Sequence, residues 1–291
     1  MHTNQDLYKN LLSRHSIRRY KHDLLGKEEL LKISNFTQVV ESLDDKNIFY
    51  FKLFEYQPET PSGKALGGFG RIMNPPYFMA PFINGNINSI VDLGFRTQQI
   101  VLDLWSKGIG SCYVGCVHRQ NRVKQLLNLS NPIKIISFLI FGLPDKNQSL
   151  RLYQKISQVF TRSKKRLSYE ELFLDHQLPE NVRRNILVKK ILEAGRYAPS
   201  ATNAQPWRFN IKENQFTIFA HQKKIANIYD LEQGYSLHDT GICMANMSKA
   251  AQALGTAIRW CWVDADFNKQ PSNGIDIPIA FFSLDDLRSN L

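Results

Sequence analysis

Two long stretches of the sequence share a register, and this repeat restricts the possible folds more than any other feature. Each stretch reads as a helix with one apolar face, ends in a glycine, and leads into a strand with an aromatic residue. The matching pairs are Asp92 with Asp239, Gly94 with Gly241, Gly108 with Gly255, and Tyr113 with Trp260, all 147 residues apart (239 − 92). Because residue identity, spacing and element order agree, the sequence predicts a tandem duplication.

The size and composition of the chain fit two globular repeats. A chain of 291 residues has room for one large domain or two of ordinary size. Hydrophobic residues make up 43% and charged residues 22%, a balance typical of globular proteins. We expect residues 1–173 to form the first repeat and residues 174–291 to form the second.

Apolar spacing predicts helices and strands along the whole chain. The expected helices are residues 6–12, 27–39, 89–107, 122–127, 182–192 and 238–254. The expected strands are residues 47–54, 77–83, 111–114, 133–141 and 207–211. Residues 58–70 read as a polar loop with glycines, and residues 151–166 as a basic connector without strong periodicity.

A ten-residue stretch, APSATNAQPW at positions 198–207, joins an expected helix to an expected strand. Pro199 ends the helix, because it has no N–H and its ring clashes with the preceding turn. The loop then offers hydroxyl and amide side chains and free backbone N–H groups, which suit a polar, planar or phosphorylated ligand. The alternative is a turn closed by a local asparagine hydrogen bond.

The net charge of +11 calls for an anionic partner. The candidates are nucleic acid, an anionic membrane or a phosphorylated small molecule, and the alternative is a solvated basic surface. The basic clusters are Arg14, Arg18, Arg19 and Lys21, and Arg162, Lys164, Lys165 and Arg166. No zinc finger, basic zipper or aromatic RNA-binding strand accompanies them. We therefore favour the phosphate of a bound cofactor, and expect neither nucleic acid nor membrane as a partner.

The cysteines and the apolar segments indicate a cytoplasmic protein. Four cysteines do not make a disulfide framework in a chain of this length. Cys112, Cys116 and His118 could suggest a metal site, but no second ligand pair follows, so buried thiols are the expectation. Residues 1–6 have no apolar core and no apolar run approaches membrane length, so we expect neither a signal peptide nor a transmembrane helix.

Two segments carry a family resemblance. The stretch at 198–207 resembles the A-P-S-x-x-N-x-Q-P-W loop that nitroreductases place beside a bound flavin mononucleotide (FMN). The segment RHSIRRY at 14–20 resembles the family's R-x-S-I-R-x-[YF] signature. These signatures normally lie a few tens of residues apart in one short domain, whereas here most of the first repeat separates them.

The resemblance implies an α+β protein: a nitroreductase-like fold duplicated in one chain, with two mixed or antiparallel sheets flanked by helices and related by a pseudo-twofold axis. In the family, two subunits form a homodimer, and each flavin site combines a basic segment from one subunit with the loop from the other. A fused chain would be a monomer that mimics this dimer.

Each repeat keeps one half of the family's flavin site. The segment opposite the second-repeat loop, residues 41–46, carries Asp44 and Asp45, which are unsuited to a flavin phosphate. Near the start of the second repeat, residues 181–185 lack the full R-x-S-I-R pattern of the basic signature. The surviving halves, at Arg14–Arg18 and Pro199–Asn203, would therefore build one FMN site, and the other site would be lost.

The resemblance also suggests roles for individual residues. Arg14, Arg18, Lys164 and Arg166 would hold the phosphate, as the last two precede a family-like L-x-x-E-E tail. His15 and Ser16 would bind the ribityl chain or flavin edge, and Pro199, Ser200, Ala201 and Asn203 would line the isoalloxazine ring. Arg71 is the candidate near the N1–O2 edge, and Val114 and Gly115 would place a backbone N–H near N5.

The implied activity is hydride transfer from NADH or NADPH to a small acceptor such as a nitroaromatic or a quinone. Flavin chemistry needs little acid–base help from the protein, and the sequence offers no catalytic triad or carboxylate pair. The alternatives are a flavin-binding protein without turnover and a basic nucleic-acid-binding protein.

Overall fold

The computed structural model describes residues 4–145, 165–222, 224–225, 228–229, 234–263 and 276–287. Internal contacts divide the chain into two compact units. The N-terminal unit comprises residues 14–161, and the C-terminal unit comprises residues 162–291 together with residues 1–13. The predicted boundary of the sequence repeats, between residues 173 and 174, concerns the duplication and stays a prediction. Lys164 and residues 151–163 of the basic connector lie outside the described residues.

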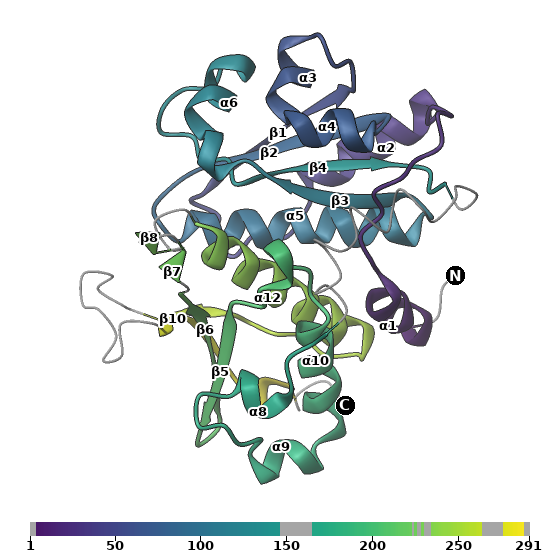
Figure 1. The fold of residues 1–291 in the computed structure, drawn as a ribbon. Coiled ribbons are helices and arrows are strands. Elements are labelled where there is room, and N and C mark those ends of the chain that lie inside the picture. Colours follow the sequence, from purple (N-terminus) through teal and green to yellow (C-terminus); the bar gives the residue numbers. More distant parts are fainter. Residues whose placement is uncertain are drawn as a thin grey trace. The chain divides into compact units, whose positions relative to one another are not determined.

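The N-terminal unit contains a four-stranded sheet with helices on both faces (Figure 1). Its elements are α2 (Lys27–Gln38), β1 (Ile48–Glu55), α3 (Pro61–Leu66), α4 (Gly68–Met73), β2 (Tyr77–Asn84), α5 (Ser89–Ser106), β3 (Gly110–Gly115), the short 3-10 helix η1 (Val117–Arg119), α6 (Gln120–Leu127) and β4 (Ser137–Gly142). One face packs on α2 and α5, and the other on α3 and α6, so each face has its own apolar core.

The C-terminal unit contains a second four-stranded sheet and a two-stranded hairpin. Its elements are α1 (Asn4–Ser13), α8 (Tyr169–Leu172), α9 (Glu180–Arg184), α10 (Ile186–Arg196), η3 (Ala201–Asn203), β5 (Trp207–Lys212), β6 (Gln215–His221), β7 (Lys224–Ile225), β8 (Ile228–Tyr229), α12 (Tyr235–Ala253), β9 (Cys261–Trp262), β10 (Asp276–Ser283) and η4 (Asp285–Leu287). The helix α12 is buried along almost its whole length, and it packs against α10, β5 and β6.

The two large sheets have the same topology. Their strand orders are β1-β2-β4-β3 and β5-β6-β10-β9, and every neighbouring pair is antiparallel. Numbered as they follow along the chain, the strands of both sheets lie side by side in the order first, second, fourth, third, and a long helix connects the second strand to the third. This confirms the expected α+β class with two antiparallel sheets flanked by helices. The pseudo-twofold relation between the units stays a prediction.

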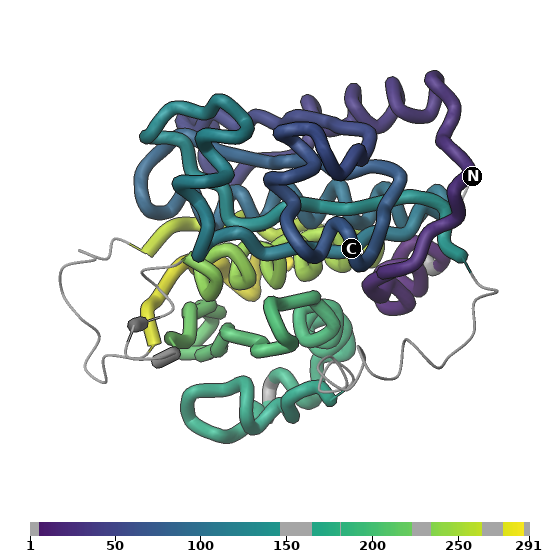
Figure 2. Tube along the Cα trace, turned by 45° about the horizontal axis from the view of Figure 1, so that its top comes forward, coloured from purple at the N-terminus to yellow at the C-terminus, as the bar shows by residue number. Residues whose placement is uncertain are grey.

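The helix α1 belongs to the C-terminal unit although it comes before the N-terminal unit in the chain. It packs against α12, and the hydroxyl of Tyr8 donates a hydrogen bond of 2.9 Å to the carbonyl of Lys190 on α10. The chain leaves this unit after Ser13 and enters the other at Arg14. Figure 2 traces this path along the chain.

Two of the expected elements differ from the structure. Residues 58–70 include α3 and the start of α4, because Thr60 caps α3 by accepting from the N–H of Gly63 and Pro61 suits the first helical position. The expected helix at 182–192 is broken at Asn185, whose side chain caps α10 by accepting from the N–H of Val188. In both cases a local cap sets the helix start, which apolar spacing does not reveal.

Candidate functional site

The second loop, residues 198–206, connects α10 to β5 in the C-terminal unit. Three of its residues that are not glycine have positive φ: Thr202 at 52°, Asn203 at 58° and Gln205 at 50°. Left-handed backbone at such residues costs about 1–3 kcal/mol each and persists only where surrounding contacts fix it. Such strain clusters at ligand sites, so the local backbone marks this loop as a candidate site.

Gln205 holds the loop closed from inside. It is only 2% exposed, and its backbone N–H donates to the hydroxyl of Ser200 over 2.9 Å. Its side-chain oxygen accepts from the N–H of Leu167 at 2.9 Å, and its side-chain nitrogen donates to the carbonyls of Lys165 and Asn203 at 3.2 and 3.3 Å. One buried amide therefore ties the loop to itself and to residues 165–167.

Arg166 binds the start of the same loop and the end of α10. Its Nη1 donates to the carbonyl of Ala198 at 2.8 Å and to Oδ1 of Asn203 at 3.1 Å, and its Nη2 donates to the carbonyl of Tyr197 at 3.1 Å. The last carbonyls of a helix lack donors within the helix, and an arginine can satisfy them. Burial lowers the pKa of Arg166 from its usual value, which reflects how far the guanidinium is removed from water.

Asp239 holds the loop from the opposite direction, on α12. Its Oδ2 accepts from the N–H of Ala201 at 2.8 Å, and its Oδ1 lies 3.5 Å from Nδ1 of His238. Burial raises the pKa of the Asp239 carboxyl, and the contacts with His238 and the Ala201 N–H act in the opposite direction. The loop conformation is thus fixed by α12 as well as by the segment that carries Arg166.

The first loop, residues 39–47, occupies the matching place between α2 and β1 in the N-terminal unit. Here Asp92 on α5 accepts from the N–H of Leu43 at 2.8 Å and from the side chain of Asn47 at 3.1 Å. Arg96 donates to Asp92 at 3.1 Å and to the carbonyl of Asp44 at 3.4 Å. In each unit, therefore, an aspartate of the long helix holds the loop that precedes the first strand of the sheet.

The basic signature at 14–20 runs beside β3 in the N-terminal unit. The N–H of Ile17 donates to the carbonyl of Ser111 at 2.9 Å, and the hydroxyl of Tyr20 donates to the carbonyl of Ile17 at 2.6 Å. A Cβ at Gly110 would lie 2.6 Å from the Ile17 side chain, so the close approach requires a glycine there. The signature is therefore a fixed, packed segment of this unit.

Three predicted ligand residues of the signature gather at one strand. Arg14 is only 8% exposed, although arginine is seldom buried to this degree. Burial raises the pKa of the Cys112 thiol on β3, while the charges of Arg18 and Arg14 and hydrogen bonds from Ser16 and Arg18 lower it. These interactions place Arg14, Ser16 and Arg18 around the same buried thiol, which gives this end of β3 a concentration of positive charge.

Three further predicted residues belong to the N-terminal unit as well. The ring of His15 lies 4.9 Å from the ring of Trp105 in an edge-on arrangement. Val114 is buried on β3, and Gly115 is the last residue of that strand, opposite Ser137 on β4. The strand that carries Val114 and Gly115 is the same one that the basic signature flanks.

Arg71 has a contact of its own in the N-terminal unit. It lies on α4, its side chain is 68% exposed, and it forms an ion pair of 3.7 Å with Glu59. Lys164, the remaining predicted ligand, lies outside the described residues.

Three residues that shape the two loops are not among the predicted site residues. Gln205 stands inside the family-like motif, yet its role as an internal tie depends on the fold. Asp239 and Asp92 were noted only as matching members of the repeat. Their shared position was a usable signal, because a buried acidic residue in an apolar helix needs a partner.

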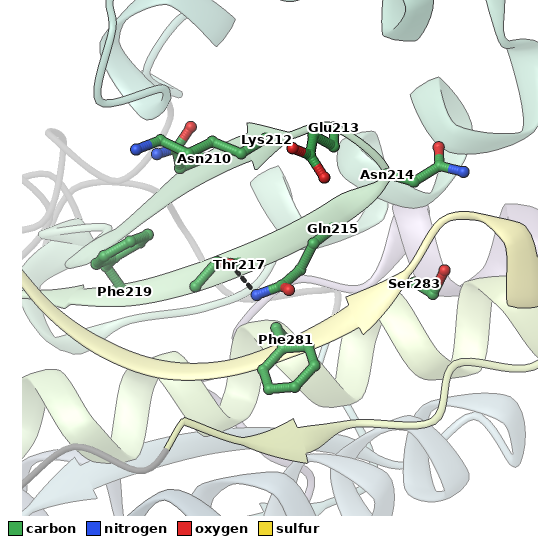
Figure 3. Close-up of a pocket in the computed structure, with 9 residues that line it drawn as sticks. All are labelled: Asn210, Lys212, Glu213, Asn214, Gln215, Thr217, Phe219, Phe281 and Ser283. Atoms are coloured by element: carbon green, nitrogen blue, oxygen red, sulfur yellow. Dashed lines mark hydrogen bonds between the residues drawn. The ribbon is translucent and has the colours of Figure 1, made fainter.

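The outer face of β5, β6 and β10 forms a separate shallow hollow of about 600 Å³ (Figure 3). Its lining residues are Asn210, Lys212, Glu213, Asn214, Gln215, Thr217, Phe219, Phe281 and Ser283. The corresponding face of the N-terminal unit is covered by α3 and α6, whereas β5 and β6 are joined by a two-residue turn. The hollow contains none of the predicted site residues and reads as the solvated face of an antiparallel sheet.

The four cysteines are free thiols. Cys112, Cys116 and Cys243 are buried free thiols, and Cys261 is an exposed one. Among the described residues, no three or more His, Cys, Asp or Glu side chains gather as a metal site would require. Within the same ranges, no helix has the length and apolar character to cross a bilayer.

Comparison with known proteins gives the family. The family model described as "Putative TM nitroreductase" matches residues 6–251. No curated protein matches the chain. A Thermotoga maritima structure described as a "putative nitroreductase" is similar over 98% of this chain and 96% of its own, with 17% identity and a TM-score of 0.57.

Shorter structures match part of the chain. The NADPH:FMN oxidoreductase from Vibrio harveyi, solved with NAD+, covers 54% of this chain and 84% of its own at 18% identity and a TM-score of 0.43. An FMN-dependent nitroreductase from Clostridium difficile covers 48% and 88% at 20% identity and a TM-score of 0.42. The full-length likeness supports the fold, and because the family model spans residues 6–251, the chain belongs to this nitroreductase family.

Proposed function

We propose that the protein is an FMN-dependent oxidoreductase that accepts electrons from NADH or NADPH and delivers them to a small acceptor such as a nitroaromatic or a quinone. The observation that carries the proposal is the second loop. It has the family-like sequence, three strained residues and hydrogen bonds from two directions. A loop held in this way is suited to binding a rigid, planar group, because little further ordering is needed.

The residues fit FMN in chemical type. Arg14 and Arg18 supply positive charge beside β3, as a phosphate requires, and Lys164 and Arg166 are the other predicted phosphate ligands. Pro199, Ser200, Ala201 and Asn203 offer the loop surface for the ring, and His15, Ser16, Val114 and Gly115 would bind the flavin chain and edge. When bound, FMN supplies the redox chemistry, while the protein supplies orientation and charge.

Arg71 is the predicted ligand of the N1–O2 edge. Its side chain is exposed on α4 and forms an ion pair with Glu59. A role near the N1–O2 edge would require Arg71 to leave Glu59. An ion pair this exposed is worth about 0–1 kcal/mol, so such a change costs little.

The proposed assembly is a cytoplasmic monomer with one FMN. The signature begins at Arg14, directly where the chain leaves α1 and enters the N-terminal unit. The duplicated topology supports a fused pair of family subunits, and the first loop carries Asp44 and Asp45 in place of the family residues. Flavin released from denatured protein should amount to one per chain, and light scattering should give the monomer mass. Two flavins per chain would contradict loss of the other site.

The visible absorption spectrum of freshly purified protein tests the proposal. Bound oxidised flavin gives a yellow protein, and excess NADPH or NADH without oxygen should remove the oxidised band. A band that disappears only with dithionite would favour flavin binding without turnover. A colourless protein that does not take up added FMN, and whose affinity for nucleic acid falls steeply with salt, would favour the basic nucleic-acid-binding alternative.

A further inference from the structure

We propose that Arg166 is a positioning residue, which sets the shape of the second loop, and that it is not a ligand of the flavin phosphate. This inference rests on the proposed function and changes one of the roles suggested by the family resemblance. Its basis is that three protein acceptors hold the guanidinium, at Ala198, Asn203 and Tyr197.

The acceptors of Arg166 explain why an arginine is needed. Two are backbone carbonyls at the end of α10, and the third is the side chain of Asn203, whose own φ is 58°. A planar guanidinium can reach three such oxygens at once, whereas a lysine ammonium is a compact charge on a flexible stem. The Tyr197 ring lies 5.7 Å from the guanidinium carbon and restricts its plane further.

Asn203 and Gln205 make further hydrogen bonds between the second loop and residues 165–167. The side chain of Asn203 donates to the carbonyl of Lys165 at 2.9 Å while its oxygen accepts from Arg166. Gln205 donates to the same Lys165 carbonyl and accepts from the N–H of Leu167. Two of the three residues with positive φ are therefore bonded directly to the segment that carries Arg166.

The first loop supplies an internal comparison. There Arg96 donates to a backbone carbonyl of the loop, at Asp44, and an aspartate of the long helix accepts a loop N–H. That loop lacks the family sequence, and an arginine and an aspartate hold it all the same. In the second loop Arg166 also donates to a backbone carbonyl and Asp239 also accepts a backbone N–H, although Arg166 precedes α8 whereas Arg96 lies on α5. This likeness in contacts favours a positioning role for Arg166.

Paired binding of FMN and riboflavin separates the two roles, because riboflavin lacks the phosphate. The variants are Arg166→Ala and Arg166→Lys, with Arg18→Ala as the phosphate-side comparison and exposed Arg184→Ala as the control for loss of a charge. Quenching of flavin fluorescence gives each Kd, and circular dichroism with thermal melting confirms that each variant is folded.

A positioning role predicts that Arg166→Ala raises the Kd of FMN and of riboflavin by the same factor, about 10- to 100-fold. Arg166→Lys should behave like Arg166→Ala, because the charge remains but the fork is lost. Arg18→Ala should raise the Kd of FMN alone, and Arg184→Ala should change neither. If Arg166→Ala fails to fold, Arg166→Lys takes its place. Gln205→Ala removes an uncharged contact with the same segment, and a positioning role predicts that both variants raise the Kd of FMN and of riboflavin by equal factors.

The opposite results overturn the inference. A loss confined to FMN in Arg166→Ala, with most affinity retained in Arg166→Lys, would make Arg166 a phosphate ligand. Unchanged affinity for both flavins would remove it from the site altogether. Wild-type protein that binds neither flavin would instead contradict the proposed function, so the two failures are distinguishable.

Discussion

The two loops that follow α2 and α10 are built on one plan and differ in strain. In both, an aspartate of the long helix accepts a backbone N–H of the loop, from Leu43 in one and Ala201 in the other. All of residues 39–47 are described, and none of them has positive φ, whereas the second loop has three such residues. The shared aspartate is therefore a feature of the fold, and the strained backbone is specific to the loop with the family sequence.

This difference indicates which contacts serve stability and which serve ligand binding. Asp92 has an ion pair with Arg96 and a hydrogen bond from Asn47, so the first loop is tied down by charge and amide contacts within its own unit. In the second loop, the hydrogen bonds instead hold Asn203 and Gln205 in an unfavourable backbone conformation with positive φ. Substitutions at matching positions should therefore have different outcomes in the two loops.

The largest effect is expected for Asp92→Ala. The change leaves Arg96, whose side chain is 12% exposed, without its carboxylate, and deprives the N–H of Leu43 of its acceptor. Breaking a buried ion pair costs about 3–5 kcal/mol. Urea unfolding should show that loss, while FMN affinity under folding conditions stays within about twofold. A loss under about 1 kcal/mol would mean that the first loop does not depend on Asp92.

A smaller loss of stability, with a larger loss of binding, is expected for Asp239→Ala. The buried N–H of Ala201 loses its acceptor, which costs about 1–3 kcal/mol. The second loop should then bind FMN about tenfold more weakly. Asp239→Asn keeps an oxygen that can accept this bond, so it is the matched control and should retain most of the affinity. If Asp92→Ala weakened FMN binding as much as Asp239→Ala does, the assignment of stability to the first loop and of ligand binding to the second would be wrong.

A gain in stability is expected for Thr202→Gly. Thr202 is exposed and has a φ of 52°, which glycine adopts without the steric cost of a side chain. The free energy of unfolding should rise by about 0.5–1 kcal/mol, while FMN affinity falls because the free loop samples more conformations. Lys46→Gly, at an exposed position of the first loop, should instead lower stability slightly and leave FMN affinity unchanged.

The smallest difference between the loops is expected in their response to pH. Burial raises the pKa of both Asp92 and Asp239, so the folded protein holds these protons more tightly than the unfolded chain does. The stabilising contribution is full below the unfolded pKa and is lost as the pH rises through each raised pKa. Unfolding measured from pH 4 to 7 should show a smaller decline in Asp239→Asn than in wild type. An identical profile would show that Asp239 does not titrate in this range.

The sequence was informative where a pattern repeats over many residues. The register of Asp92 with Asp239 predicted the long helices α5 and α12, and the motif at 198–207 led to the family. The break at Asn185 and the helix α3 depend on single caps, which alter the chain path without altering its apolar period. The hydrogen bonds made by Gln205 and Arg166 join segments that meet only after folding, so they could not be foreseen, and the family resemblance suggested a phosphate ligand for Arg166.

The placement of α1 has a consequence for how the chain reaches its folded state during synthesis. Tyr8 bonds to Lys190, 182 residues later, so α1 leaves the ribosome long before its partners α10 and α12 exist. At about 5–20 residues per second, the delay is on the order of ten seconds or more. The N-terminal unit, which is continuous from 14 to 161, can fold within that time, while the apolar face of α1 remains uncovered. A nascent chain arrested before residue 186 should therefore leave Leu11 of α1 exposed to solvent, whereas the folded chain buries it.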